Sequence, residues 1–203
     1  MTRFVLTVLL ALLTSLAARA DALDALRAFA RDVKSARAEF TQTVTAADGV
    51  RTKVSRGSFE FLRPNRFRFI YRQPFEQSIV ADGSKVWIYD VELNQASSRK
   101  LAQALGATPA ALLAGGDLEH DFVLQDQGAK DGLDWLLATP RSADTGIRSL
   151  RVGFKGDLLA ALEIVDGFGQ RSRLDFSGLV PNVAIAPESF RFVPPPGTDV
   201  IEQ

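Results

Sequence analysis

The segment from Gly57 to Pro74 constrains the fold of this chain more than any other. It holds two runs of aromatic residues spaced two apart, on either side of a Pro-Asn pair: Phe59 and Phe61, then Phe67, Phe69 and Tyr71. Because successive side chains of a strand point to opposite faces, the pattern predicts a β-hairpin with large rings at alternate positions. A sheet face with this many aromatic residues is either the core of a β-protein or the wall of an apolar pocket.

The length of the turn decides whether these rings share one face. A two-residue turn at Pro64 and Asn65 would pair Leu62 with Phe67 and place the rings of the two strands on opposite faces. A three-residue loop would place all five rings on one face. Pro-Asn is not among the preferred two-residue hairpin pairs, and the sequence leaves both registers open.

The first twenty residues have the pattern of a cleaved secretory signal peptide. Arg3 gives a positive start, residues 4–13 are apolar, and Ala18-Arg19-Ala20 fits the cleavage rule of small residues on either side of a variable one. As a membrane anchor the segment is short and ends on Arg19. We therefore expect a mature chain of residues 21–203 that is exported and not anchored in a membrane.

Composition limits the partners of the mature chain. Without Arg3 and Arg19 it has 22 basic and 24 acidic residues, a net charge of −2, which argues against nucleic-acid binding. Cysteine is absent, so the chain has neither disulfides nor an N-terminal lipid on cysteine. A length of 183 residues without a linker-like segment predicts one domain.

Hydrophobic periodicity predicts helices at two places in the chain. Asp21 can cap a first amphipathic helix that extends to about Lys34. Between Arg99 and Gly116 the Ala/Leu-rich sequence predicts two short helices, broken at Gly106. The chain is thus expected to contain three helices.

Period-two segments separated by turn residues predict the strands. Ten are expected, at residues 39–44, 51–62, 66–73, 78–81, 85–90, 122–127, 134–139, 149–155, 158–166 and 171–179. Phe190 and Phe192 add a possible eleventh. The sequence therefore predicts a mainly β (α+β) fold whose antiparallel sheet curls into a complete or partial barrel.

Catalytic motifs are weak. The chain has no cysteine nucleophile, a single histidine and no phosphate-binding glycine loop. His120 lacks the partners of a metal site, and Ser97 to Lys100 matches Ser-x-x-Lys without the accompanying motifs of penicillin-recognising enzymes. We expect no enzymatic activity, no metal and no cofactor.

Aromatic content favours a hydrophobic ligand. The mature chain has thirteen Phe residues, mostly at period-two positions of expected strands. Each ring alone is explained by core packing, but a sheet of about ten strands curling around its apolar face tends to enclose a cavity.

Several motifs, in order along the chain, resemble those of the LolA family of periplasmic outer-membrane lipoprotein carriers. They are Phe40-Thr41-Gln42, Leu62 to Phe67 (Leu-Arg-Pro-Asn-Arg-Phe), Gln73-Pro74, Asp82-Gly83, Val86 to Tyr89 (Val-Trp-Ile-Tyr) and Thr108-Pro109. The resemblance covers essentially the whole mature chain. It implies an unclosed β-barrel covered by a helical lid, with a cavity that receives the acyl chains of a lipoprotein.

The resemblance also assigns roles to residues of this chain. Candidates for the acyl-chain cavity are Phe40, Phe59, Phe61, Phe67, Phe69, Tyr71, Trp87, Tyr89 and Phe176. The apolar face of the three-helix lid is expected at Leu23, Leu26, Phe29, Val33, Leu101, Leu105, Leu112 and Leu113. Arg63 is the expected lid latch, bonded to backbone carbonyls of the lid; without the resemblance it would be a solvated turn arginine.

The family context implies partners as well. A LolA-like carrier takes acylated lipoproteins from an ATP-driven (ABC-type) inner-membrane release complex and passes them to the outer-membrane receptor LolB. The receptor is anchored through an N-terminal cysteine that this chain lacks, so the carrier is the better match, and we expect a monomer. Glu60 and Arg66 depart from the apolar residues typical of the family, and a periplasmic binder of another lipid is the alternative function.

Overall fold

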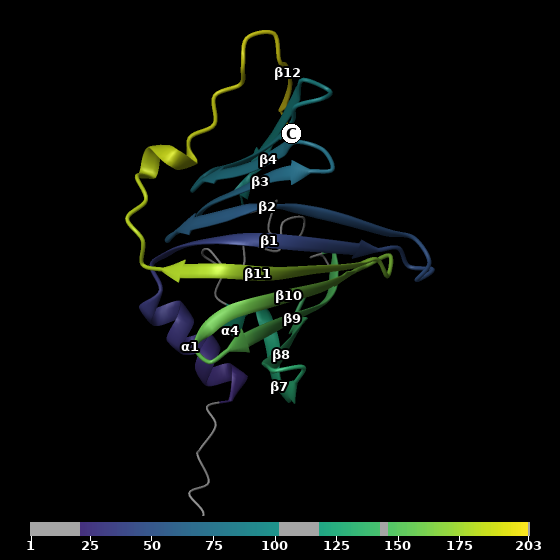
Figure 1. Ribbon diagram of the computed structural model, residues 1–203, viewed down its shortest axis with the longest axis vertical. Helices are drawn as coiled ribbons and strands as arrows, with labels where there is room; N and C mark the ends of the chain where they lie inside the picture. The colour runs from purple at the N-terminus through teal and green to yellow at the C-terminus, as the bar shows by residue number, and fades with distance from the viewer. Residues whose placement is uncertain (1–20, 102–117, 143–145, 203) are drawn as a thin grey trace, which may run out of the picture.

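One strongly curved sheet of twelve strands forms most of the protein (Figure 1). The computed structural model describes residues 21–101, 118–142 and 146–202. The first half of the sheet comprises β1 (Ser35–Thr45), β2 (Thr52–Leu62), β3 (Arg66–Gln73), β4 (Gln77–Asp82), β5 (Lys85–Asp90) and β6 (Gln95–Lys100). The second half comprises β7 (Phe122–Lys130), β8 (Leu133–Pro140), β9 (Ile147–Lys155), β10 (Leu158–Asp166), β11 (Arg171–Pro181) and β12 (Asp199–Glu202).

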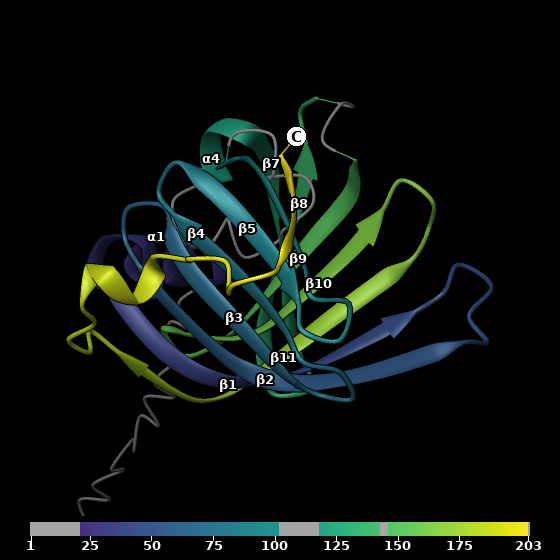
Figure 2. The same ribbon diagram turned by 90° about the horizontal axis from the view of Figure 1, so that it is seen from above.

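The strand order leaves the barrel unclosed. It runs β12-β6-β5-β4-β3-β2-β1-β11-β10-β9-β8-β7, so β12 and β7 are the two edges. Every pairing is antiparallel except that of β12 with β6, which is parallel. Seen from above, the strands wrap around an interior that helix α1 (Ala22–Asp32) flanks on one side (Figure 2).

Helix α1 begins where the sequence predicts. The Asp21 carboxylate accepts a hydrogen bond from the Asp24 amide at 2.8 Å, which caps the first turn. The apolar face of the helix, with Leu26 and Phe29, is buried against the sheet. Its amphipathic pattern therefore positions it as a cover over the end of the sheet formed by β7 to β10.

Side-chain alternation divides the sheet into two faces. The concave face includes Phe59 and Leu162, and its side chains form the main hydrophobic core with α1. The convex face includes Glu60 and Trp87 and is covered in part by the C-terminal segment. That segment contains the 3-10 helix η2 (Pro187–Phe190), which contacts β3 and β4.

The ten strands predicted from periodicity are all present, but the total of ten to eleven and the purely antiparallel sheet are wrong. Strands β6 and β12 complete the twelve, and β12 adds the parallel pair. Phe190 lies in η2 and Phe192 follows it, so the possible eleventh strand is also wrong.

The helices of the described residues do not match the expected three-helix lid. Among the described residues the α-helices are α1 and the four-residue α4 (Leu118–Asp121). Arg99 and Lys100, expected at the start of a helix, belong to β6. The remainder of the two expected Ala/Leu helices falls on residues 102–117, outside the described residues. None of the helices in the described ranges has the length and apolar character needed to span a bilayer.

Candidate functional site

The hairpin of β2 and β3 has the three-residue loop. Leu62 pairs with Arg66, Phe61 with Phe67, and Phe59 with Phe69, which leaves residues 63–65 in the turn. Asn65 adopts a positive φ of 63°, a conformation that Asn tolerates better than most residues. This register places all five hairpin aromatics on the concave face.

The concave aromatic rings pack directly against one another. Phe59 stacks on Phe69 with ring centroids 4.4 Å apart, and Phe40 meets Phe69 edge-on at 5.3 Å. Phe176 lies 5.4 Å from Phe59, and Phe67 is fully buried. We call this set, Phe40, Phe59, Phe61, Phe67, Phe69, Tyr71 and Phe176, the aromatic wall.

A glycine makes the close contacts at one end of the wall possible. Gly57 pairs with Phe40 across β1 and β2, and a Cβ at position 57 would lie 1.9 Å from the Ile70 carbonyl oxygen. The same Cβ would meet the Phe40 ring at 3.0 Å. Only glycine therefore allows β3 and the Phe40 ring to approach β2 here.

Helix α1 covers the other end of the wall. The Phe29 ring lies 6.0 Å from Phe61 and 6.2 Å from Phe154, so it joins the two halves of the sheet. Leu26, Phe29 and Val33 are buried, and Leu23 is half-buried against the same core. All four predicted apolar positions of this helix thus face the concave side.

Arg63 lies where the hairpin turn meets the end of α1. Its Nε donates a hydrogen bond to the Val33 carbonyl oxygen at 3.0 Å, and its guanidinium lies over the Phe29 ring at 5.8 Å and the Phe61 ring at 5.4 Å. Burial lowers the pKa of Arg63 from its usual value. The side chain therefore connects the hairpin turn to the C-terminal end of α1.

A second side chain fastens the same end of the helix. Asn182 donates from Nδ2 to the Asp32 carbonyl oxygen at 3.0 Å and accepts from the Lys34 amide at 2.8 Å. Elsewhere α1 is held differently: at its N-terminal end the Ala22 amide donates to the Asp126 carboxylate at 3.3 Å, and at its midpoint Arg27 forms an exposed ion pair with Glu119 at 2.7 Å. Sequence reasoning missed Asn182, whose position after a strand gave no indication of this contact.

A cavity of about 490 Å³ opens on the concave face beyond the wall. Its lining is mixed: apolar and neutral polar residues such as Val44, Ser55, Tyr71, Phe75 and Leu93 lie beside the charged Lys53, Asp90 and Glu92, with Gln42, Pro74 and Gln77 completing it. Burial raises the pKa of Tyr71 from its ordinary value to about 12. The sequence-based prediction of the cavity did not include Gln42 and Val44. Both continue the period-two pattern that begins at Phe40, and that pattern could have identified them.

Two of the nine predicted cavity residues lie on the wrong face. Trp87 and Tyr89 alternate with the concave Val86, and their rings pack on Phe192 at 5.4 and 5.5 Å on the convex side. They cannot line a concave cavity in this structure. The prediction was wrong because the strand is apolar at successive positions, so period two does not identify its inner face.

Glu60 also lies on the convex face, so it does not alter the aromatic wall. Its side chain is buried between two arginines, accepting from Arg37 Nε at 2.6 Å and from Arg68 at 2.7 Å. Arg66 pairs with Leu62 on the same face. The two departures from the family pattern are therefore outward-facing positions.

Of the remaining predicted lid residues, one lies within the described residues. Leu101 is buried in the main core, and its amide donates to the Ser84 carbonyl oxygen at 2.9 Å. Leu105, Leu112 and Leu113 lie outside the described residues.

The residues considered for catalysis do not assemble into a site. Ser97 and Lys100 belong to the extended strand β6 and are three residues apart, so their side chains point to opposite faces. His120 faces its neighbour Asp121, with Nδ1 and Oδ1 2.7 Å apart. Within the described ranges no group of three His, Cys, Asp or Glu residues is placed to hold a metal ion.

Comparison with known proteins agrees with this geometry. The family model described as "Outer membrane lipoprotein carrier protein LolA" matches residues 31–193. Curated relatives named outer-membrane lipoprotein carrier protein are 57% identical in Leptothrix cholodnii, over 92% of this chain and 88% of theirs, and 56% identical in Methylibium petroleiphilum, over 92% of both.

Two solved structures share the fold at low sequence identity. A LolA superfamily protein from Nitrosomonas europaea is 13% identical, with a TM-score of 0.50 over 84% of this chain and 96% of that one. An uncharacterized conserved protein from Thermus thermophilus is 12% identical, with a TM-score of 0.56 over 89% and 96%. The match to the family model and the two close relatives show that this chain belongs to the LolA family of outer membrane lipoprotein carrier proteins.

Proposed function

We propose that this protein carries lipoproteins by holding their acyl chains against the aromatic wall, beneath helix α1. The observation that carries the proposal is the packing of six Phe rings and Tyr71 on one concave face, with a cavity of about 490 Å³ at its open end. Burial of a methylene group is worth about 0.8 kcal/mol, so a sixteen-carbon chain costs on the order of 12 kcal/mol in water. A multiply acylated protein therefore needs such a cover to leave a membrane.

The contacts of α1 suggest how the cover opens. Its C-terminal end is fastened by Arg63 and Asn182, whereas the rest of the helix is held by one hydrogen bond from the Ala22 amide to the Asp126 carboxylate of β7 and by the exposed ion pair of Arg27, at the helix midpoint. We infer that the helix swings about its C-terminal end and exposes the wall between Phe29 and Phe61. Arg63 then acts as the latch that sets the free-energy difference between closed and open lid.

The partners follow from this role. We propose that an ABC-type inner-membrane complex loads the carrier and that the outer-membrane receptor LolB unloads it. Transfer to the receptor requires only tighter binding of the same acyl chains there, so the carrier needs no nucleotide site and no catalytic step. Residues 1–20 are the proposed signal peptide, and the mature monomer, a single domain of residues 21–203, acts in the periplasm.

A cavity-filling variant tests the site. Ser55 is half-buried in the cavity lining, and Ser55→Phe should reduce the affinity for a fluorescent long-chain fatty acid by about tenfold. Val54→Phe is the matched control, because Val54 precedes Ser55 on β2 and faces outward with 46% exposure. Equal affinities of the two variants would contradict the proposed site.

Mass spectrometry of the protein purified from periplasm tests the cargo. We expect co-purified acylated peptide. Free lipid alone would favour a binder of another lipid, and an empty protein that turns over an ester would favour an enzyme.

A further inference from the structure

Two hairpin turns, far apart in the sequence, lie side by side at the end of the sheet. One joins β1 to β2 (residues 46–51), and the other joins β10 to β11 (residues 167–170). Both project from the same end in two perpendicular views (Figures 1 and 2). A Cβ built on Gly169 would lie 3.5 Å from the Ala47 Cβ, so the two turns are in contact. We call residues 46–51 and 167–170 the turn pair.

The turn pair presents two large apolar side chains to solvent. Phe168 is 92% exposed and Val50 is 80% exposed, more than the other large apolar residues of the described chain. The Phe168 turn is also well fixed: the Asp166 carboxylate accepts from the Phe168 and Gln170 amides, each at 2.9 Å. A single exposed apolar residue is common on protein surfaces, but here two of them project from turns that touch each other, which concentrates apolar surface at one end of the sheet.

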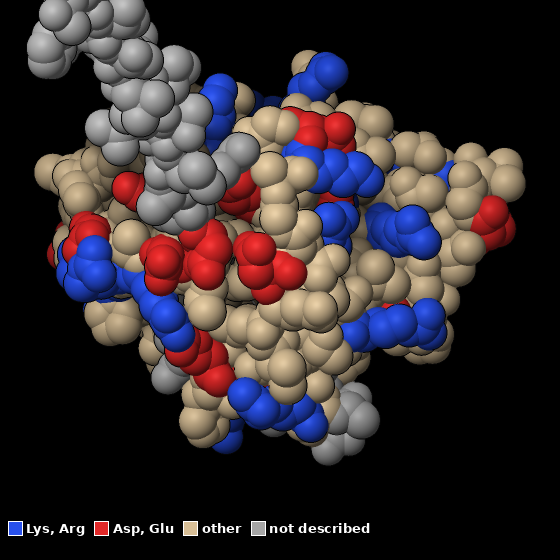
Figure 3. All heavy atoms as spheres, turned by 90° about the horizontal axis from the view of Figure 1, so that it is seen from below, with Lys and Arg blue, Asp and Glu red and all other residues tan. Residues whose placement is uncertain are grey.

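Arginines surround these apolar side chains. Arg148 donates to the Gly167 carbonyl oxygen at 3.3 Å. Arg51 forms an ion pair with Asp48, with Nε and Oδ2 3.5 Å apart. Arg171, exposed at the start of β11, makes no hydrogen bond or ion pair with any described residue through its guanidinium. Seen from below, basic side chains dominate the end of the molecule toward which the turns project, whereas most acidic ones lie nearer the opposite end (Figure 3).

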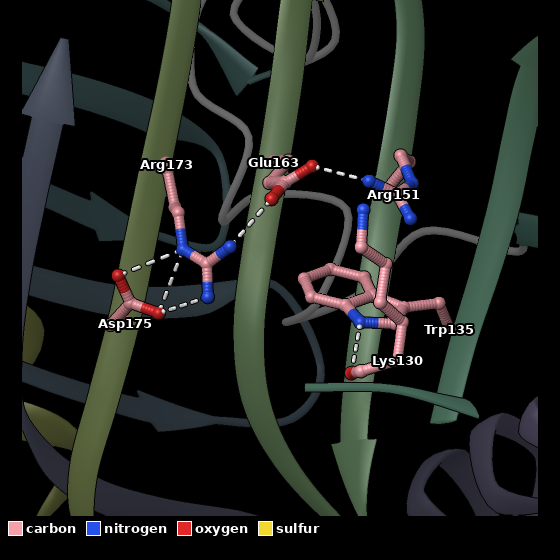
Figure 4. Close-up of polar contacts among 6 residues, drawn as sticks. All are labelled: Lys130, Trp135, Arg151, Glu163, Arg173 and Asp175. Atoms are coloured by element: carbon pink, nitrogen blue, oxygen red, sulfur yellow. Dashed lines mark hydrogen bonds and ion pairs between the residues drawn. The ribbon is translucent and has the colours of Figure 1, made fainter. Parts of the chain in front are cut away.

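A pocket of about 450 Å³ lies directly behind the turn pair on the convex face, lined by Arg151, Arg171 and Arg173. Glu163 bridges two of them, accepting from Arg151 at 2.8 Å and from Arg173 at 2.7 Å (Figure 4). Arg151 also lies over the Trp135 ring, 4.6 Å from its centroid. Arg173 also donates to the Asp175 carboxylate, at 2.7 Å from Nη2 (Figure 4). The arginine wall is thus fixed by two carboxylates, and Arg171 is the arginine of the lining that neither of them pairs.

We propose that the turn pair docks on the surface of an anionic phospholipid bilayer. Phe168 and Val50 enter the interfacial region, while Arg171 and Arg148 contact lipid phosphates. Exposed apolar side chains with flanking basic residues suit the boundary between headgroups and acyl chains, and each basic residue near an anionic leaflet strengthens binding by about fivefold. The inference goes beyond the carrier function, because it needs no cargo.

Vesicle co-sedimentation of the purified protein tests the proposal. We expect binding to vesicles of 70% phosphatidylcholine and 30% phosphatidylglycerol, and little binding to phosphatidylcholine alone. Phe168→Ser should weaken the binding about tenfold and Arg171→Gln about fivefold. The matched controls are Val193→Ser, at a residue 67% exposed in the C-terminal segment, and Arg191→Gln in the same segment. Both controls should bind as the wild type does.

A Phe168→Trp variant gives a second readout, since its emission should shift to the blue on anionic vesicles only. Equal binding to both vesicle types, wild-type binding by Phe168→Ser, or no binding at all would overturn the proposal. Chemical-shift changes with inorganic phosphate but none with vesicles would also overturn it, in favour of a small-anion pocket. Fatty-acid binding in the same preparation is read separately, so a failure here leaves the carrier function standing.

Discussion

The Arg63 side chain donates a hydrogen bond from Nε to the Val33 carbonyl oxygen, 3.0 Å away, and so joins the β2–β3 turn to the C-terminal end of helix α1. The Arg63 amide also donates to the Lys34 carbonyl oxygen at 2.8 Å. Turn and helix are therefore connected by two bonds from one residue, beside the Asn182 contacts to the same segment. Loss of the side chain alone leaves the rest of this junction in place.

Arg63→Leu should fold normally yet deliver cargo slowly. Leucine fills the space beside Phe29 and Phe61, so we expect a loss of about 1 kcal/mol in the free energy of unfolding, the value of one hydrogen bond. The closed lid then no longer competes with bound acyl chains, and release to an acceptor should slow by on the order of tenfold. Transfer kinetics and thermal denaturation measure the two effects. Arg66→Leu, three residues along, is the control, and wild-type transfer by Arg63→Leu would rule out the latch.

Gly57→Ala tests the close packing of the aromatic wall. The new methyl group would meet the Ile70 carbonyl oxygen at 1.9 Å, so β2 and β3 must separate. We expect a loss of about 3 kcal/mol or more in the free energy of unfolding, measured by urea denaturation. Gly167→Ala is the control: its nearest contact is the Gly146 carbonyl oxygen at 3.7 Å, and its effect should stay within about 0.5 kcal/mol. Equal urea-denaturation midpoints for Gly57→Ala and the wild type would show that β2 and β3 can separate without loss of stability.

The aromatic hairpin could be predicted from sequence, but the inner faces of other strands could not. Phe59, Phe61, Phe67 and Phe69 alternate with polar residues, so their shared side was predictable once the loop had three residues. Strand β5 has Val86 and Trp87 adjacent, and only the packing of Phe192 shows which of them points outward. Periodicity fails where both faces of a strand are buried.

Strands β6 and β12 were missed for a different reason. The sequence Gln-Ala-Ser-Ser-Arg-Lys of β6 has low β propensity, and the strand is fixed by its neighbours rather than by its own residues. Its parallel pairing of Gln95 with Asp199 joins segments about a hundred residues apart, which no local pattern encodes. The contact of Arg63 with the end of α1 was predictable only through the family motif, because Arg63 alone is a turn arginine.

Glu60→Gln should reduce stability in a pH-dependent way. Burial opposes the charge of Glu60, but the hydrogen bonds and charges of Arg37 and Arg68 outweigh it, and its pKa is lowered. A lowered pKa means that the charged pair stabilises the fold fully above the unfolded value of about 4.5 and that this stabilisation is lost as the pH falls through the folded value. We expect Glu60→Gln to cost about 2 kcal/mol at pH 7.

Melting temperatures of wild type and Glu60→Gln between pH 7 and pH 2 check this. The two curves should converge below the ordinary range of a glutamate pKa. Glu39→Gln, which removes the exposed pair with Arg72, should change little at any pH. A difference in melting temperature between wild type and Glu60→Gln that stays constant down to pH 2 would show that Glu60 acts by packing alone.

Glu119→Gln tests whether the contact between α1 and α4 limits the opening of the helix. The Arg27–Glu119 pair is about half exposed, so its contribution to closure is modest, and its loss should speed the uptake of a fluorescent fatty acid about twofold at low salt. Because salt screens exposed pairs, the difference should vanish near 0.5 M sodium chloride. Asp32→Asn removes an equally short exposed pair, with Arg31 at 2.7 Å, that lies within α1 and connects it to no other element, so it should leave uptake unchanged. Uptake by Glu119→Gln no faster than by Asp32→Asn would show that the contact between α1 and α4 does not limit opening.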